Sequence, residues 1–284
     1  MQIATWNVNS VRSRLEQVLA WLERQRPEVL CLQETKVEDG SFPLEPFTAL
    51  GYSAVISGQK AYNGVAILSL LPLEDVRIGF DAVLSDGPAL ALAEQKRVIS
   101  ARIEGVRVLN LYVPNGSALR SEKYAYKLEW LACLRRYLDA QDADADPLCM
   151  VGDFNIALDD RDIHDPERLS GGIMASDAER QALGQALEGR LSDVFRLFEP
   201  ERGHWSWWDY RSGAWDRDSG WRIDHIYLSE ELQERATGCL IHKAVRGNDK
   251  PSDHAPVVVQ LQWPPDADAD DDDAYNDDNE EGLE

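Results

Sequence analysis

Residues 147–155, PLCMVGDFN, give the clearest indication of the fold, because they form an uninterrupted apolar run that ends in polar residues. A short apolar run without alternation is typical of a strand that is buried on both faces. Asp153 and Asn155 close the run, and alternate residues of an extended chain point to the same face. We therefore expect a buried strand that brings a carboxylate and a carboxamide to one side of its carboxyl end.

Other segments place an apolar run next to polar residues in the same way. Residues 3–8 (IATWNV) and 28–35 (EVLCLQET) predict two buried strands, and the apolar spacing between them predicts a helix. A capping-box pattern, Ser13-x-x-Glu16, lies near the start of that helix. The two segments 97–103 and 106–113 flank Glu104-Gly105, which suits a hairpin.

The remaining pattern mixes hairpins with strand–helix units. This mixture predicts a layered α/β sandwich with mixed sheets, and we treat residues 1–263 as one domain. The other expected elements are a strand pair at 52–57 and 64–71, a helix at 121–140, a helix opened by the capping box Ser176-x-x-Glu179, and strands near 205–208, 222–229, 239–245 and 256–262.

The composition is that of a folded, acidic protein. Of its 284 residues 44% are apolar, which excludes a mainly disordered or fibrous chain, and its formal net charge is −22. No stretch approaches the roughly 18–20 uncharged apolar residues that span a bilayer, and no secretory leader is visible at the N-terminus. The four cysteines form no CxxC pair, and Cys31 and Cys149 lie inside apolar runs, so we expect these two thiols to be buried and the compartment to be reducing and cytoplasmic.

Residues 264–284 differ from the rest of the chain. They hold 11 of the 51 acidic residues and no basic residue. Such a segment has little to bury and repels itself, so a disordered acidic tail is expected, with Pro264-Pro265 at its boundary. Two roles remain open for it: a solubilising appendage, or a competitor that occupies a basic face in place of a polyanionic substrate.

Polar residues at strand ends form a candidate catalytic set. Each could be a turn former or a helix cap, and His254 could be a structural histidine. Taken together they favour a site, since the strands of a sandwich bring such residues to one edge. Oxygen ligands without sulfur select a hard cation such as Mg²⁺ or Mn²⁺, which fits metal-assisted hydrolysis of a phosphate ester. The set is Asn7, Glu34, Asp153, Asn155, Asp224, Asp253 and His254.

Seven motifs occur along the chain in this order: TWNVNSVRSR (5–14), LQETK (32–36), NLYVPNG (110–116), GDFNIALDDRDIHDP (152–166), SWWDYRSGAW (206–215), GWRIDHIYLS (220–229) and KPSDHAPV (250–257). Together they resemble the exonuclease III family of AP endonucleases, and the similarity covers nearly all of residues 1–262. The resemblance implies a four-layer α/β sandwich, in which two β-sheets pack face to face between outer helices.

The resemblance also implies a metal site. Glu34 would bind Mg²⁺, with Mn²⁺ as a substitute, and Asn7 would lie beside it. Asp253 corresponds to a further acidic residue near the metal. Asn9 is uncharged where some relatives carry a carboxylate, so one metal or two remain open. The other residues around the metal would be Asp153, Asn155 and His254.

The same resemblance assigns the groups around the phosphate. Asp153 would activate or position the attacking water, and Asn155 would hold that group and the phosphate. His254, oriented by Asp224, would contact the scissile phosphate, and the hydroxyl of Tyr112 would point at it. An in-line water and a neutralised phosphate charge are what phosphodiester hydrolysis requires.

Five of the nine tryptophans fall within residues 205–221, interleaved with arginines. These rings could pack in the core, which we expect for Trp208, but rings beside cations also suit a nucleic-acid surface. By resemblance, three apolar side chains here form a small pocket for a flipped-out baseless deoxyribose, an arginine enters the DNA groove and an asparagine touches phosphate. These positions are Trp207, Trp221 and Ile223, then Arg211, then Asn115.

Basic residues near the motifs could form a DNA-binding face despite the negative net charge, because screening makes the local charge decisive. We expect salt-sensitive binding with few phosphate contacts. The candidates are Lys36, Arg97, Lys123, Lys127, Arg211, Arg222 and Lys250.

The implied activity is Mg²⁺-dependent cleavage of double-stranded DNA on the 5′ side of abasic sites, as in base excision repair. The resemblance also implies 3′→5′ exonuclease and 3′-phosphatase activity at 3′ ends, by a monomer. Two alternatives remain: a non-catalytic DNA-binding relative, or a phosphoesterase of the wider endonuclease/exonuclease/phosphatase superfamily that acts on another phosphate ester.

Overall fold

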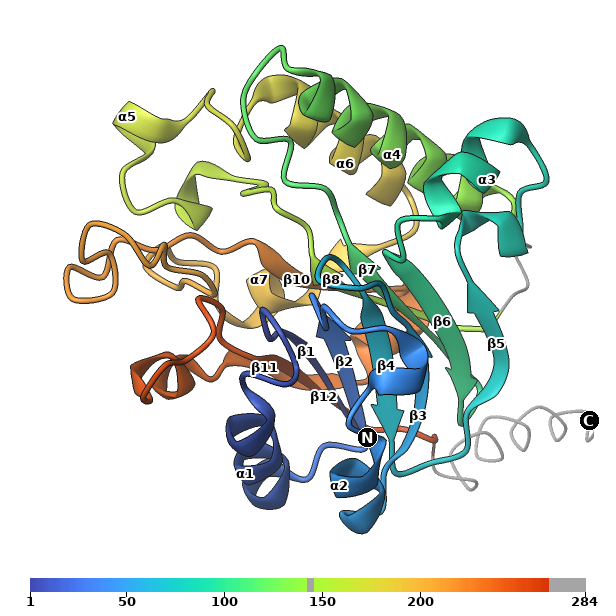
Figure 1. Cartoon of the computed structure of the whole chain (residues 1–284). Coiled ribbons are helices and arrows are strands. Elements are labelled where there is room, and N and C mark those ends of the chain that lie inside the picture. Colours follow the sequence, from blue (N-terminus) through green and yellow to red (C-terminus); the bar gives the residue numbers. More distant parts are fainter. Residues whose placement is uncertain (142–145, 266–284) are drawn as a thin grey trace, which may run out of the picture.

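The structure, a computed structural model, describes residues 1–141 and 146–265. Within these residues the chain forms two β-sheets of six strands each, packed face to face, and helices cover both outer surfaces (Figure 1). The expected four-layer α/β sandwich with mixed sheets is confirmed.

The first sheet places strands from both ends of the chain side by side. Its spatial order is β11-β12-β1-β2-β4-β3, in which β1 and β2 are parallel and the other neighbours antiparallel. Because β12 lies against β1, the segment just before β12 reaches the carboxyl end of β1. The strands are β1 (Gln2–Asn7), β2 (Val29–Gln33), β3 (Ser53–Ser57), β4 (Val65–Ser69), β11 (Ala236–Ile241) and β12 (Val257–Leu261).

The second sheet is built in the same way around a parallel central pair. Its order is β5-β6-β7-β8-β10-β9, in which β7 and β8 are parallel and the other neighbours antiparallel. The expected hairpin around Glu104-Gly105 is confirmed as the β6–β7 connection. The strands are β5 (Glu74–Ile78), β6 (Val98–Ile103), β7 (Val106–Tyr112), β8 (Leu148–Asp153), β9 (Ser192–Asp193) and β10 (Asp224–Leu228).

The helices cover the two outer faces. α1 (Leu15–Gln25) and α2 (Leu44–Ala49) pack on the first sheet, whereas α3 (Gly87–Ala93), α4 (Glu122–Asp139) and α6 (Asp177–Leu187) pack on the second. The predicted capping box at the start of α6 is confirmed, since Ser176 and Glu179 cap each other's backbone N–H groups. The shorter helices are α5 (Pro166–Leu169), α7 (Val194–Phe198) and α8 (Glu230–Glu234), and 3-10 turns lie at Asp39–Ser41, Phe80–Ala82, Asp160–Asp162 and Lys243–Gly247.

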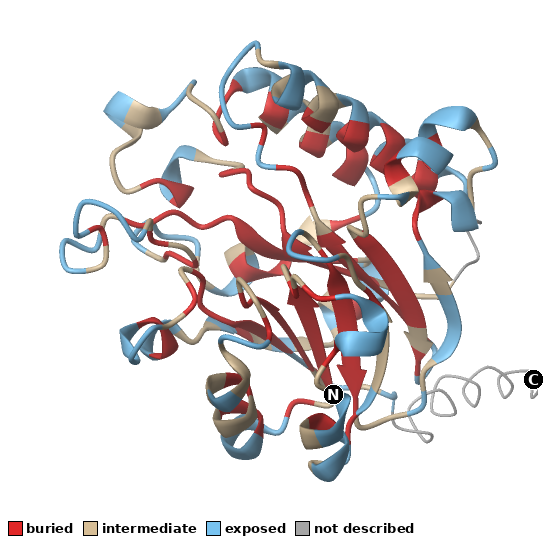
Figure 2. Ribbon diagram, in the orientation of Figure 1, coloured by how far each residue is buried: buried red, intermediate tan, exposed pale blue. Residues whose placement is uncertain are grey.

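Side chains of the central strands point alternately toward the opposite sheet and toward the outer helices. In β1, Ile3 faces the opposite sheet while Ala4 and Trp6 face α1, and in β8, Cys149 and Val151 face inward in the same way. Figure 2 shows that these strands are buried along their length, whereas the helices are exposed on their outer sides. Continuing the period of two brings polar side chains inward at one end of the strands, which is where the candidate site lies.

Some local predictions were wrong. Residues 205–208 form no strand, because Trp207 only makes isolated bridges to Trp221 and His254 at a place where three segments cross. Helix α1 begins at Leu15 without a capping box, since the Ser13 hydroxyl bonds to that of Ser10 instead of a helical N–H. The strand expected at 239–245 is displaced toward the N-terminus, as β11.

The predictions for the chain end are mostly untested. Residues 266–284 lie outside the described residues, so the acidic tail and the domain boundary at residue 263 stay predictions. Among the described residues, no helix is long and apolar enough to cross a membrane. The buried positions expected for Cys31 and Cys149 are confirmed.

Candidate active site

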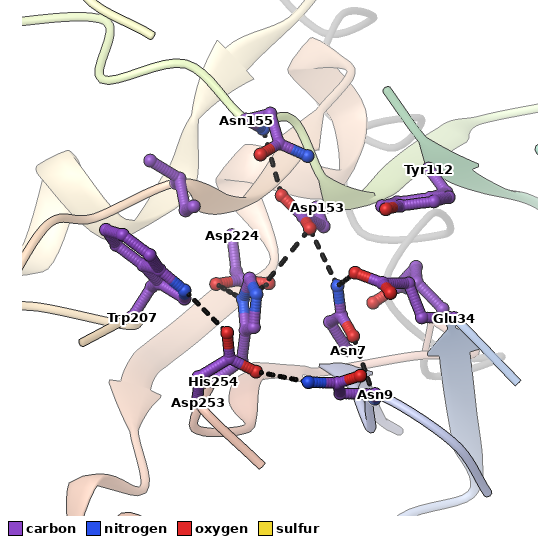
Figure 3. Close-up of polar contacts among 12 residues, drawn as sticks. Asn7, Asn9, Glu34, Tyr112, Asp153, Asn155, Trp207, Asp224, Asp253 and His254 are labelled. Carbon is purple, nitrogen blue, oxygen red and sulfur yellow. Dashed lines mark hydrogen bonds and ion pairs between the residues drawn. The ribbon is translucent and has the colours of Figure 1, made fainter. Parts of the chain in front are cut away.

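A carboxylate-rich group lies at the rim between the two sheets. One ligand atom each of Glu34, Asp153 and His254 lie within 4.8 Å of one another. The Asn7 amide joins the two carboxylates, because its Nδ2 donates to Glu34 Oε1 at 2.9 Å and to Asp153 Oδ2 at 2.8 Å (Figure 3). Residues separated by more than two hundred positions in the sequence therefore meet at one point.

Strand register explains this convergence. Asp224 of β10 is paired with Asp153 of β8, and Tyr112 at the end of β7 is paired with Asp153 from the other side. Asn7 ends β1, which packs against β8 across the sandwich. Because β10 and β12 run antiparallel to β8 and β1, their amino ends reach the rim that the carboxyl ends of β1, β2, β7 and β8 also reach.

The backbone around the site adopts conformations that non-glycine residues rarely use. Glu34, Asn155 and Asn9 have φ values of 50°, 50° and 44°. Such strain persists only where the surroundings hold it, and it is concentrated at functional sites. Gly152 has a φ of 148°, and a Cβ there would lie 1.9 Å from the carbonyl oxygen of Leu111, so the residue before Asp153 must be glycine.

His254 is held by an aspartate, as the resemblance implied. Its Nδ1 lies 2.8 Å from Asp224 Oδ2, which also accepts a hydrogen bond from the Ser206 hydroxyl at 2.7 Å. Burial alone would lower the pKa of His254, but the carboxylates of Asp224 and Asp153 raise it to about 10. The imidazolium directs its other nitrogen, Nε2, toward Asp153 Oδ2 at 3.7 Å, which suits a donor to an anionic oxygen.

The carboxyl groups of the site titrate differently. Burial raises the pKa of Asp153 to about 7, although His254 opposes this shift, and the neighbouring Asp224 adds to it. Burial alone would raise the pKa of Glu34 as well, but the Lys36 ammonium 2.8 Å away and the Asn7 amide hold it below the usual value. Burial raises the pKa of Tyr112, and Glu34 and Asp153 reinforce this, so its hydroxyl remains a proton donor.

The other predicted metal neighbours have structural partners. Asn155 Nδ2 donates to the Val113 carbonyl at 3.0 Å, and its Oδ1 accepts from Asn115 Nδ2 at 2.8 Å. The Asp253 carboxylate accepts from Trp207 Nε1 at 2.9 Å and from Asn9 Nδ2 at 3.0 Å. Glu34 and Asp153 also accept hydrogen bonds, but their oxygens lie with a His254 nitrogen within 4.8 Å of one another, and oxygen donors are those that Mg²⁺ prefers.

The predicted apolar pocket residues lie together beside this group. Trp207 bridges to Trp221 on one side and to His254 on the other, and its ring centroid is 6.4 Å from that of His254. Trp221 and Ile223 belong to one buried apolar cluster, against which Trp207 packs. The sequence did not reveal the other members of this cluster, which are Ala157, Ile163, Leu169, Ile173, Met174 and Ala175.

The residues expected to form a DNA-facing basic set differ in their exposure. Arg211 is 89% exposed and free to reach a ligand, and the Arg97 guanidinium lies 4.6 Å from the centre of the Tyr112 ring. The prediction that Lys127 and Arg222 face DNA is wrong, because both are buried in ion pairs with acidic residues of the interior. A lone cation in the sequence cannot be told from a paired one when its partner lies more than fifty residues away.

The protein has marked similarity to known nucleases. The sequence pattern of the Endonuclease/Exonuclease/phosphatase family matches residues 4–254. The chain belongs to this family. It is 36% identical to exodeoxyribonuclease III of Haemophilus influenzae over 274 residues, which cover 92% of this chain and 100% of that protein.

Solved structures agree with this membership. A 3′ phosphatase from Neisseria, NExo, bound to a product DNA hairpin, is 40% identical, with a TM-score of 0.87 and coverage of 93% and 100% of the two chains. An AP endonuclease from Archaeoglobus fulgidus is also 40% identical, with a TM-score of 0.86 and coverage of 92% and 99%. The chain is a nuclease of the exodeoxyribonuclease III and AP endonuclease type.

Sequence reasoning missed how Lys36, Gln33 and Asn110 support the candidate site. Lys36 Nζ donates to Asn9 Oδ1 at 2.5 Å in addition to pairing with Glu34. Beneath the site, Gln33 Nε2 donates to Asn110 Oδ1 at 2.7 Å and so links the two sheets. The polar letters of LQETK and NLYVPNG were visible in the sequence, but only the register shows that they face each other.

Proposed function

We propose that this nuclease hydrolyses the DNA backbone on the 5′ side of an abasic site, leaving a 3′-hydroxyl, with Mg²⁺ as cofactor and Mn²⁺ as a substitute. The observation that carries the proposal is the position of Trp207, which is bridged to His254 and to Trp221. An apolar cluster therefore adjoins the carboxylates. That arrangement suits an enzyme that binds a sugar without a base and cleaves next to it.

The charged groups divide the chemistry between them. Glu34 and Asp153 would hold the cation, which when bound neutralises phosphate charge and lowers the pKa of an attacking water. Burial raises the pKa of Asp153 to about 7 in the metal-free protein, and beside the cation its carboxylate would activate or position the attacking water. The contacts of Asp153 Oδ2 with Asn7 and His254 would hold the carboxylate in one orientation toward that water.

The donors of the site would stabilise charge on the phosphate. His254 is cationic at neutral pH, and Asp224 fixes its orientation, so Nε2–H can donate to a phosphate oxygen. The Tyr112 hydroxyl remains protonated and is a second donor. The Asn115 amide is bonded to Asn155, which in turn donates its backbone N–H to Asp153 Oδ1 at 2.9 Å.

The apolar cluster would select the lesion. Trp207, Trp221 and Ile223 would form a small pocket that accepts a bare deoxyribose more readily than a full nucleotide, and a site that has lost its base has less stacking to lose on extrusion. Arg211, on an exposed loop near this cluster, would enter the DNA groove. Duplex DNA with abasic sites is therefore the proposed substrate, and a monomer is the proposed form.

The same centre would process 3′ ends. The Neisseria relative is named a 3′ phosphatase, and the Haemophilus relative an exodeoxyribonuclease. A 3′-terminal phosphate is a phosphomonoester, and a 3′-terminal nucleotide is joined to the strand by a phosphodiester. Asp153 and His254 would act on either bond in the same way, so we include 3′-phosphatase and 3′→5′ exonuclease activity in the proposal. DNA as substrate and four buried free thiols suit a protein of the cytoplasm.

The test is cleavage of a duplex with one tetrahydrofuran abasic analogue, in Mg²⁺, in Mn²⁺ and in EDTA. We expect one incision 5′ to the analogue in either metal and none in EDTA. A 3′-recessed duplex and a 3′-phosphate duplex, run alongside, measure the two other activities. Cleavage that persists in EDTA would overturn the metal role, and no cleavage in any divalent metal would favour a non-catalytic DNA-binding protein.

A further inference from the structure

Two helices outside the second sheet share a buried ion pair. Lys127 of α4 and Glu179 of α6 are both 0% exposed, and Lys127 Nζ lies 2.5 Å from Glu179 Oε1. Taking two charges out of water is costly, so a buried pair contributes little net stability and is often replaceable by apolar side chains. The contacts that the pair makes with its surroundings therefore matter more than the pair itself.

The ammonium of Lys127 connects two loops of the active site. Besides Glu179, it donates to the carbonyl oxygen of Asn155 at 2.7 Å and to that of Asn115 at 3.3 Å. An ammonium group has three N–H donors, and here all three have an acceptor. Lys127 thus holds the backbones of the two asparagines whose side chains are bonded to each other at 2.8 Å.

The strained backbone of Asn155 explains why such a support is needed. Asn155 has a φ of 50°, and its N–H donates to Asp153 Oδ1 at 2.9 Å. The left-handed region is less favourable than the right-handed one even for asparagine, so contacts with its surroundings help to hold Asn155 there. Without the Lys127 contact, relaxation of Asn155 would withdraw the donor that orients the Asp153 carboxylate.

The carboxylate of Glu179 reaches the apolar cluster on the opposite side. Its Oε1 accepts from the backbone N–H of Met174 at 3.2 Å, and its Oε2 accepts from the N–H and the hydroxyl of Ser176 at 3.1 and 2.6 Å. Met174 is a member of the cluster that contains Trp221 and Ile223, and its sulfur lies 3.5 Å from Asn115 Nδ2. Glu179 therefore fixes one edge of the proposed lesion pocket.

We propose that Lys127 and Glu179 are positioning residues that hold the Asn115 and Asn155 backbones and the Met174 edge of the pocket in one fixed arrangement. Turnover and lesion discrimination then depend on the same buried pair, although neither residue touches the substrate. This inference rests on the proposed function for its kinetic consequences, but not for its structural one.

The decisive variant replaces both charges at once, Lys127→Met with Glu179→Met. The double change leaves no unpaired buried charge, so the protein is expected to fold, whereas each single change leaves one charge uncompensated. Arg107→Met is the matched control, because Arg107 is a buried cation on β7, paired with Asp75 at the end of the strand far from Tyr112. Unfolding by denaturant confirms that every variant is folded under the assay conditions.

Hydrogen exchange tests the structural consequence directly. In the double variant we expect faster exchange in peptides covering residues 113–117, 153–157 and 172–176, and unchanged exchange there in Arg107→Met. Wild-type exchange rates in all three peptides of the double variant would overturn the inference. This readout needs no substrate, so it holds even if the protein is inert on abasic DNA, which would count against the proposed function alone.

Kinetics test the functional consequence. For cleavage of the abasic analogue we expect kcat to fall roughly 10–100-fold in the double variant with KM changed less than about threefold, as for a lost alignment. The ratio of cleavage at the analogue to cleavage of intact duplex should fall as well, and Lys127→Arg, which keeps the charge, should retain more turnover than Lys127→Met. Wild-type kcat and ratio in a folded double variant would contradict the inference.

Discussion

Two buried clusters of charged residues lie near the start of β10, and they differ in how well their positive and negative charges are matched. In the first, which we name the balanced cluster, Arg222 donates to Asp162 at 2.6 Å and to Asp193 at 2.5 Å, and Arg196 also pairs with Asp162. Two carboxylates thus meet two guanidinium groups. In the second, the site cluster of Glu34, Asp153, Asp224 and Asp253, the cations that form ion pairs with the four carboxylates within the described residues are Lys36 and His254.

Two aspartates of similar burial therefore have opposite pKa shifts. Burial would raise the pKa of Asp162, but Arg222 and its neighbours lower it to about 2. Asp153 lacks such compensation, and its pKa rises to about 7. The balanced cluster needs nothing further, whereas the site cluster lacks positive charge that a divalent cation would supply. The difference indicates which cluster serves structure and which serves chemistry.

The largest effect is expected from removing the charge of Asp153. In Asp153→Asn the residue can no longer accept a proton or hold the cation, so turnover on the abasic analogue should fall by about 10³–10⁴-fold, with little loss of DNA affinity. Single-turnover cleavage and a binding titration measure the two quantities. Asp162→Asn, the same change in the balanced cluster, is the control, and equal losses of turnover in both variants would contradict the distinction.

Breaking the balanced cluster should lower the stability of the protein. Asp162→Ala removes the buried carboxylate that Arg196 and Arg222 share, and breaking a buried pair costs about 3–5 kcal/mol of unfolding free energy. Urea unfolding at pH 7 measures the loss. The folded pKa of Asp162 lies below the unfolded one, so its contribution is present above about pH 4 and disappears as the pH falls toward 2. A variant as stable as wild type at pH 7 would show that the cluster is not structural.

Shape rather than charge is tested at Trp221. Trp221→Ala opens the apolar cluster beside the site cluster, so intact nucleotides are excluded less well. We expect the ratio of kcat/KM for the abasic analogue to that for intact duplex to fall by about 10–100-fold, as for an altered apolar pocket. Competition between the two duplexes in one reaction gives this ratio. A ratio equal to that of wild type would place the lesion pocket elsewhere.

The smallest expected effect is a gain in stability rather than a loss. The folded pKa of Asp153 lies above the unfolded value, so the ionised carboxylate destabilises the metal-free fold, and this cost grows as the pH rises toward 7. Asp153→Asn should therefore raise the unfolding free energy at pH 8 in EDTA by about 0.5–2 kcal/mol. The gain should vanish at pH 4. A loss of stability at pH 8 would mean that the site cluster is compensated after all.

Strand patterns predicted much of this from sequence. Apolar runs that end in polar residues marked β1, β2 and β8, and period-two alternation predicted that Asp153 and Asn155 point to the same side. These signals are local, since the period follows from the extended backbone itself. The order of the motifs then supplied the family, and with it the sandwich and the convergence of the set.

The balance of charge could not be predicted, because it depends on partners far apart in sequence. Lys127 lies in a helix, where a lysine is usually solvated, and its partner Glu179 is 52 residues away. Arg222 is 60 residues from Asp162, and it was taken for a DNA-facing cation. The positive φ of Glu34 was equally hidden, since glutamate does not favour that region, whereas asparagine adopts it more readily than most residues. Packing, rather than local propensity, fixes all of these features.

The most direct test is the affinity for Mg²⁺ measured by calorimetry from pH 5.5 to 8.5 without DNA. If the site cluster binds the cation through the Asp153 carboxylate, the Kd should weaken about tenfold for each pH unit below 7 and level off above it, because binding then displaces one proton. Asp153→Asn should bind weakly at every pH, and Asp162→Asn should follow wild type. A wild-type Kd that is constant across this range, or unchanged in Asp153→Asn, would contradict the account.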